Sequence, residues 1–203
     1  MVSTAQYFIP RLLGQFLQSY PDIEMSFDVL NRNGVIELLR NNKLDLAVMS
    51  VPPSDLDVES EIFLQNPLVP IGPRNGSLTH KKRISLREFS QTSLIMREQG
   101  SGTRLATERF FELHDLNPQI RLSLGSNEAI IQAVAGGMGY SIISTHALAS
   151  LLTDSHIVKL KVDSFPIKSQ WSIVTCRGKK LSPIATIFRD YLRNAAKELY
   201  KAS

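Results

Sequence analysis

Cysteine is nearly absent from this 203-residue chain, and its single occurrence is at position 176. One thiol cannot form a disulfide within the chain or supply a thiolate cluster for a metal. Cys176 ends the apolar run "WSIVTC", which is typical of a buried strand where cysteine acts as a small hydrophobic residue. We therefore expect a structural and not a catalytic role for this thiol.

Signals for metal binding and for membranes are also absent. The four histidines, at positions 80, 114, 146 and 156, show none of the HxH or HxxxH spacings that place two imidazoles on one metal. No apolar run approaches the ~20 residues of a membrane helix. The first ten residues lack the basic and apolar segments of a secretion signal. These observations predict a cytoplasmic protein with no metal site and no membrane partner.

Catalytic and nucleic-acid-binding patterns are equally scarce. The segment 100–104, "GSGTR", has neither the GxSxG spacing of a hydrolase nor the lysine of a Walker loop. The net charge is only +4, and the positive clusters at 80–83 and 177–180 are short and lie beside turn residues. A basic stripe of the kind that contacts DNA is not present. We expect neither a catalytic residue nor a DNA-contacting segment in this chain.

A regular alternation of helix-like and strand-like segments fills most of the sequence. Residues 4–23 have helical spacing with Ser3 or Thr4 as the N-cap, and residues 24–31 alternate as in a strand. A helix over 33–43 and an apolar strand over 44–51 follow. Helices that alternate with strands predict a mostly parallel sheet.

The same pattern restarts after residue 73, which predicts a second α/β unit. Glycines at 134–141 fit a helix end that turns into a strand. We predict an α/β fold of two Rossmann-like lobes joined by two crossing strands. Lobe I is predicted to contain residues 1–73 plus 175–203, and lobe II residues 74–174.

Four polar loops lie where predicted strands lead into helices. They contain Ser3 with Thr4, and the segments 31–33, 97–104 ("REQGSGTR") and 125–129 ("GSNEA"). In doubly wound sheets, ligands bind outside the carboxyl ends of the strands, where helix N-termini carry partial positive charge and unpaired N–H groups. The loops therefore predict a site for a small anion.

The side chains of these loops can bind an anion or serve the structure alone. Arg97, Arg104 and Arg32 are suited to bidentate contacts with a carboxylate or phosphate. Arg97 can instead pair with Glu98 or Glu128 on the surface. Caps that need no ligand are available at Ser3, Thr4, Ser126 and Asn127. The anion site is thus predicted from the convergence of the loops and not from any one residue.

Several stretches resemble the effector-binding domain of LysR-type transcriptional regulators across nearly the whole chain. They are "STAQYFIPRLLGQFLQSYPDIEMSF", "NRNGVIELLRNNKLDLAVMS", "REQGSGTR", "SNEAIIQAVAGGMGYSIIS" and "FPIKSQW". Four stretches are more specifically similar to the CbbR-like and CmpR-like branch, which controls RuBisCO operons and inorganic-carbon uptake: "VSTAQYFIP", "NRNGVIELL", "PPSDLDVESEIFLQNPLVPIGP" and "REQGSGTR".

This resemblance implies a fold like that of type 2 periplasmic binding proteins, with a small metabolite bound in the cleft between the lobes and no further cofactor. The implied effectors are 2-phosphoglycolate, ribulose 1,5-bisphosphate or 2-oxoglutarate. The family pattern places the ligand contacts at Ser3, Thr4, Asn31, Arg32, Arg97, Gly100, Ser101, Gly102, Thr103, Arg104, Ser126, Asn127 and Glu128.

The resemblance also implies partners. A winged helix-turn-helix that precedes this domain in the family is absent from this sequence, so the chain is expected to be a fragment that reaches DNA only through that missing part. Homodimers through the regulatory domains and tetramers of the full-length protein are implied.

Two other classes of protein are alternatives to a regulator. One is a solute-binding protein of a transporter for a small anion. The other, which matches less well, is an enzyme of the same bilobal shape such as a porphobilinogen-deaminase-like protein.

Overall fold

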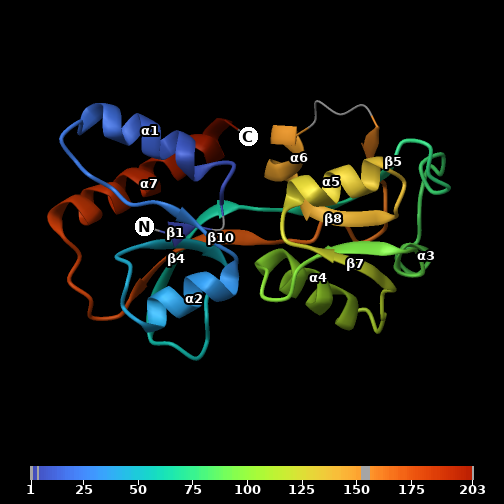
Figure 1. Ribbon diagram of the computed structural model, residues 1–203, viewed down its shortest axis with the longest axis horizontal. Coiled ribbons are helices and arrows are strands. Elements are labelled where there is room, and N and C mark those ends of the chain that lie inside the picture. Colours follow the sequence, from blue (N-terminus) through green and yellow to red (C-terminus); the bar gives the residue numbers. More distant parts are fainter. Residues whose placement is uncertain (1, 4, 152–155, 203) are drawn as a thin grey trace. The chain divides into compact units, whose positions relative to one another are not determined.

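Two five-stranded sheets, each with helices on both faces, make up the part of the chain that the computed structural model describes, residues 2–3, 5–151 and 156–202 (Figure 1). The chain divides into two units. Unit 1 contains Met1–Gln65 and Gln170–Ser203, and unit 2 contains Asn66–Ser169. The predicted α/β class and the two lobes are therefore confirmed. Thr4 lies outside the described residues.

Unit 1 has the strand order β2-β1-β3-β10-β4. Its elements are β1 (Val2–Ser3), α1 (Ile9–Ser19), β2 (Asp28–Val29), α2 (Arg32–Arg40), β3 (Ala47–Ser50), β4 (Val58–Gln65), β10 (Gln170–Cys176) and α7 (Pro183–Ala202). β1 is parallel to β2 and β3, whereas β10 is antiparallel to β3 and β4. Leu46 and Val48 pack with α1 and α7, and Ala47 and Met49 pack with α2. The period of two in the sequence thus buries both faces of β3.

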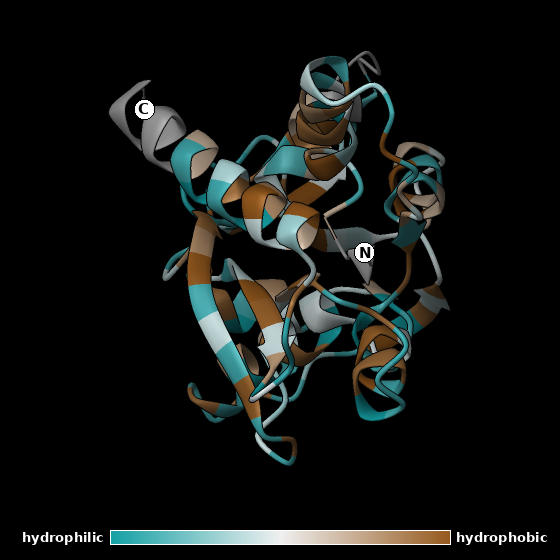
Figure 2. Ribbon diagram, turned by 90° about the vertical axis from the view of Figure 1, so that its left-hand side faces the viewer, coloured by the Kyte–Doolittle hydropathy of each residue, from teal (hydrophilic) through white to brown (hydrophobic). Residues whose placement is uncertain are grey.

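The long helix α7 covers its sheet with one apolar stripe. Phe188, Leu192 and Ala196 recur every fourth residue and are all buried. The ring of Phe188 contacts that of Phe16 in α1, with centroids 4.8 Å apart in an edge arrangement. Figure 2 shows hydrophobic and hydrophilic residues alternating along this helix, as an amphipathic element requires.

Unit 2 has the strand order β7-β6-β8-β5-β9. Its elements are β5 (Leu68–Pro73), α3 (Leu86–Ser90), β6 (Leu94–Arg97), α4 (Gly102–Glu112), β7 (Ile120–Leu124), α5 (Asn127–Ala135), β8 (Tyr140–Ser144), α6 (Thr145–Leu151) and β9 (Ile157–Lys159). β6 is parallel to β7 and β8, and β5 is antiparallel to β8 and β9. Leu94 and Met96 pack with α3 and α4, whereas Ile95 packs with α5.

The chain passes between the units at Gln65–Asn66 and at Ser169–Gln170. The sequence pattern predicts these boundaries at 73/74 and 174/175. β5 lies in unit 2 because it pairs with β8 and β9. β10 lies in unit 1 because it pairs with β4 over its whole length and with β3 over its middle. Strand pairing over long sequence distances, which a local pattern does not reveal, accounts for the difference.

Two local predictions for the first helix and strand are wrong. α1 begins at Ile9 with Phe8 at the N-cap position, and Ser3 lies in β1, where it pairs with Val29 on one side and Val48 on the other. Pro10 sets the start of the helix, because proline suits the first turn. The predicted strand 24–31 shortens to the two residues of β2.

The glycine-rich segment forms the predicted helix end and strand start. α5 ends at Ala135, Gly137 has φ of +77°, and β8 begins at Tyr140. A positive φ is the usual way to end a helix before a change of direction, and glycine adopts it without steric cost.

Candidate functional site

Two helices of unit 2 begin at the carboxyl ends of neighbouring parallel strands. β6 ends at Arg97 and leads into α4, and the parallel strand β7 ends at Leu124 and leads into α5. Arg97 and Leu124 are register partners, so the two connections start side by side. Helix N-termini at such strand ends present unpaired N–H groups and partial positive charge, which together favour an anion.

The loop between β6 and α4 turns at Gly100, which has φ of +84°. The N–H of Ser101 donates to Glu98 O at 3.2 Å, which closes the turn. Ser101 occupies the N-cap position of α4, but its side chain makes no cap hydrogen bond, although only 3% of the residue is exposed. Among the described residues this hydroxyl has no hydrogen-bond partner, which is rare for a buried polar group.

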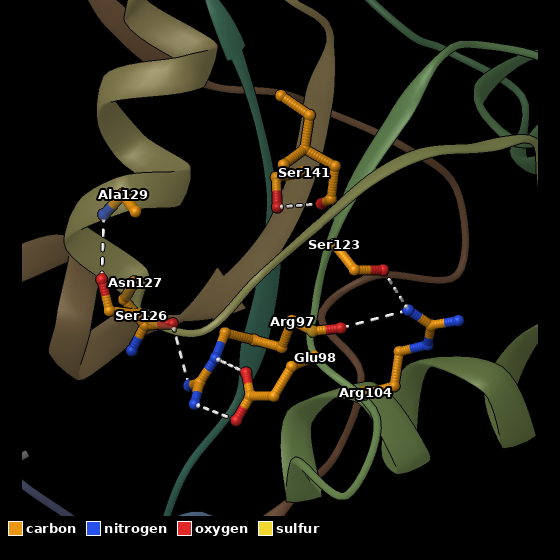
Figure 3. Close-up of polar contacts among 9 residues, drawn as sticks. Arg97, Glu98, Arg104, Ser123, Ser126, Asn127, Ala129 and Ser141 are labelled. Atoms are coloured by element: carbon orange, nitrogen blue, oxygen red, sulfur yellow. Dashed lines mark hydrogen bonds and ion pairs between the residues drawn. The ribbon is translucent and has the colours of Figure 1, made fainter.

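Arg97 extends toward the N-terminus of α5 (Figure 3). Its Nε and Nη2 donate to the two carboxylate oxygens of Glu98, at 2.8 and 3.1 Å, and Nη1 donates to Asn127 Oδ1 at 3.4 Å. The expected pairing with Glu98 is thus present. A guanidinium has five N–H donors, so two remain for further contacts.

Arg104 extends to the other side of the loop, toward β7 (Figure 3). Its Nη1 donates to Arg97 O at 3.1 Å and to Ser123 Oγ at 3.0 Å, and its Nε donates to Glu108 Oε1 at 2.5 Å. The residue is only 7% exposed. These contacts tie the first turn of α4 to the ends of β6 and β7, so Arg104 braces the loop. Direct contact between Arg104 and a ligand stays a prediction.

Residues at the start of α5 serve both the helix and the loop. Ser126 Oγ accepts from the N–H of Ala129 at 3.1 Å, which is the cap predicted as its structural role. Asn127 is 8% exposed and holds Arg97 as described above. Glu128 is exposed in the first turn, where the helix dipole favours an acidic residue.

Gly102 and Thr103 are the first two residues of α4, and the other predicted contacts belong to unit 1. Parallel pairing of β1 with β2 places Ser3 beside Val29 at the carboxyl ends of the two strands. Asn31 Oδ1 accepts from the N–H of Gly34 at 3.0 Å and so caps α2. Unit 1 therefore also presents a helix N-terminus near the carboxyl ends of parallel strands.

Arg32 and the residue that follows β3 are linked. Arg32 Nε donates to Val51 O at 2.7 Å, and Val51 has φ of +51°. A β-branched residue in the left-handed region is strained, and such strain is concentrated at binding sites. The sequence did not single out Val51, whose carbonyl is the acceptor of this Arg32 hydrogen bond.

Sequence reasoning missed two partners of Arg104. Glu108 lies four residues further along the helix, and this (i, i+4) spacing is a signal that was available. Ser123 carries no such signal, since its contact depends on the register that pairs it with Met96. The parallel pairing of two strands is set by tertiary packing.

The described residues contain no group of three or more histidine, cysteine, aspartate or glutamate side chains arranged to hold a metal. None of the helices in the described ranges has the length and apolar character needed to cross a membrane. Cys176 ends β10, where its Sγ donates to Leu39 O at 3.4 Å, in agreement with a structural role.

The two α/β units give the two-lobed, periplasmic-binding-protein-like fold. The family model of the LysR substrate binding domain matches residues 1–197. The chain belongs to this family, as the resemblance in its sequence implied.

Similar proteins place the chain in one branch of the family. It is 44% identical over 191 residues to the HTH-type transcriptional activator CmpR of Synechocystis. The aligned region covers 94% of this chain and 63% of that protein. It is 40% identical over 200 residues to a RuBisCO operon transcriptional regulator of Allochromatium vinosum. This second aligned region covers 98% of this chain and 66% of that protein. The chain thus spans about two thirds of the length of these curated relatives.

A solved structure extends the similarity to the fold. The CcmR regulatory domain of Synechocystis PCC6803, determined in complex with 2-PG, superposes with a TM-score of 0.91 at 46% identity. The match covers 97% of this chain and 95% of that one. The predicted relation to CmpR-like, CbbR-like and RuBisCO operon regulators is confirmed.

Proposed function

We propose that this chain is the effector-sensing domain of a cytoplasmic LysR-type regulator that binds a small anion reporting carbon status and thereby controls genes for CO2 fixation or bicarbonate uptake. The observation that carries the proposal is the similarity, over 97% of the chain, to a regulatory domain solved with 2-PG. We take 2-phosphoglycolate as the first candidate effector, with ribulose 1,5-bisphosphate and 2-oxoglutarate as the others.

The contacts of unit 2 support an anionic ligand. The first turn of α4 offers N–H groups without intrahelical acceptors, and the buried hydroxyl of Ser101 lies at the same helix start. Arg97 retains two N–H donors. A phosphate or carboxylate satisfies all of these donors together, and hydrogen bonds to an ionised group are the strong ones.

Contacts are expected from unit 1 as well, at Ser3, Thr4, Asn31 and Arg32. A ligand held by both units favours the conformation in which both reach it, and the size of the shift is set by the difference in affinity for the two conformations. Couplings of about 1 to 3 kcal/mol are typical of allosteric proteins. We propose that this shift alters how two such domains pack and so the spacing of the DNA-binding domains attached to them.

A second copy of the chain is the proposed partner. β7 forms one edge of its sheet, and its residues Ile120 and Leu122 are 41% and 38% exposed. An apolar edge strand that stays exposed invites association, and closed pairs usually obey two-fold symmetry. We propose that this edge contributes to the homodimer that the family pattern implies, from which the full-length protein forms tetramers.

Isothermal titration calorimetry with 2-phosphoglycolate tests the effector. We expect binding to the wild-type chain, a loss of tenfold or more in Arg97→Ala, and a loss of about tenfold in Ser101→Ala, since a hydrogen bond to an ionised group contributes about 1.5 kcal/mol or more. Ser101→Ala is expected to change stability by less than about 0.5 kcal/mol, because its hydroxyl does not cap the helix.

Arg109→Ala is the matched control, because Arg109 is an exposed arginine of the same helix. It should bind like the wild type. The proposal of 2-phosphoglycolate fails if the wild-type chain shows no binding at millimolar ligand, and titration with ribulose 1,5-bisphosphate and 2-oxoglutarate then decides between the other candidates.

A further inference from the structure

The Arg97–Glu98 pair places a carboxylate inside an anion site. Both carboxylate oxygens of Glu98 accept from Arg97, and the two side chains are only 16% and 26% exposed. Partial burial reduces the screening of this pair by water and salt. Without a ligand, Glu98 therefore neutralises much of the positive charge that attracts an anion to Arg97.

The pairing of two consecutive residues is a feature of this particular turn. Neighbouring side chains along a strand point to opposite faces of the sheet. β6 ends at Arg97, and the N–H of Glu98 still donates to Leu124 O at 3.0 Å while the chain turns toward Gly100. The end of the strand thus allows both side chains to meet on one side of the loop.

Arg97 has a second acceptor that does not depend on Glu98. Asn127 Oδ1 accepts from Nη1, and Arg104 holds the carbonyl of Arg97 from the other side of the loop. The amide of Asn127 therefore positions one end of the guanidinium, and Arg104 positions the backbone of Arg97. Arg97 thus has contacts besides Glu98 that position it, and the carboxylate of Glu98 adds a negative charge beside the guanidinium.

We propose that Glu98 is an internal competitor for Arg97, and that an anionic effector binds by taking over contacts of the guanidinium that Glu98 holds in the ligand-free chain. This inference rests on the proposed function only in assuming that the anion reaches Arg97. Glu98 thereby weakens the affinity for the effector, because a ligand must displace the Glu98 carboxylate from Arg97 in order to bind.

Glu98→Gln tests the competition, because the amide keeps the shape of the side chain and one acceptor oxygen while removing the charge. We expect Glu98→Gln to bind 2-phosphoglycolate about three- to tenfold more tightly, the effect of losing one partly buried ion pair. Inorganic phosphate, titrated separately, should show a gain of the same direction. The matched control is Glu112→Gln, which removes the same charge from an exposed position of α4.

A double variant separates competition from a general charge effect. In the Arg97→Ala background, Glu98→Gln should give no gain, because the contact for which Glu98 competes is already lost. Unchanged or weaker binding in the single variant Glu98→Gln overturns the inference, as does an equal gain in Glu112→Gln. If the wild-type chain does not bind 2-phosphoglycolate, the proposed effector fails, and the phosphate titrations of the same variants still decide the role of Glu98.

Discussion

The two arginines of "REQGSGTR" occupy different environments although they are only seven positions apart in the chain. Arg97 is held at its side chain by Glu98 and Asn127 and keeps donors available. Arg104 is buried and donates its hydrogen bonds to acceptors within the protein, namely Arg97 O, Ser123 Oγ and Glu108. The arrangement of Arg97 suits contact with a ligand, and that of Arg104 suits support of the loop.

Replacement of Arg104 by alanine should destabilise the fold. The change removes two hydrogen bonds and leaves Glu108 without its partner, so we expect the free energy of unfolding to fall by about 2 to 3 kcal/mol. Arg109→Ala should stay within about 0.5 kcal/mol of the wild type, because its side chain is exposed. Urea unfolding followed by circular dichroism measures both. Equal midpoints for the two variants would show that Arg104 is not a brace.

Among the secondary-structure elements, the N-termini of the helices carry the candidate site. α4 and α5 begin at one edge of the sheet of unit 2, and α2 begins near the carboxyl ends of β1 and β2 in unit 1. The three starts differ in their caps. Asn31 and Ser126 cap α2 and α5, whereas the hydroxyl of Ser101 makes no cap on α4. α4 is thus the helix start with unused capacity for a ligand.

Removal of the cap of α5 should cost stability. Ser126→Ala deprives the N–H of Ala129 of its acceptor, and we expect a loss of about 1 kcal/mol in thermal unfolding. Ser85→Ala is the control, since Ser85 caps α3 in the same way through the N–H of Glu88. Both variants should lose similar stability, and only Ser126→Ala should also weaken 2-phosphoglycolate. A full-affinity Ser126→Ala variant would remove the start of α5 from the proposed site.

For the assembled protein, the proposed dimer depends on one edge strand. A charge at Leu122 should break the association, because a lysine on β7 opposes strand pairing with a second copy. We expect Leu122→Lys to sediment as a monomer in analytical ultracentrifugation, with the wild-type chain as a dimer. Ile62→Lys, at an exposed residue of the edge strand β4, is the matched control and should stay dimeric. A dimeric Leu122→Lys would exclude β7 from the interface.

Periodicity and turn chemistry were sufficient to predict most helices, most strands and the two lobes. Helical spacing in α7 and the glycines after α5 are local signals, and the local backbone obeys them. The loops that form the candidate site were located for the same reason, since strand ends and helix caps are written in neighbouring residues. The family also followed from the sequence, through motifs spread along the chain.

Features that depend on strands paired across long sequence distances were not predictable. Ser3 became part of β1 and not a helix cap because β2 and β3 pair with it on both sides. The boundary between the lobes lies before β5 and not after it, because β5 pairs with β8 and β9 of unit 2. "REQGSGTR" showed which residues the loop contains, but the register of β6 with β7 assigned Arg104 to support and left Arg97 with Glu98. Contacts of this kind are set by the packing of the sheet, which no local pattern records.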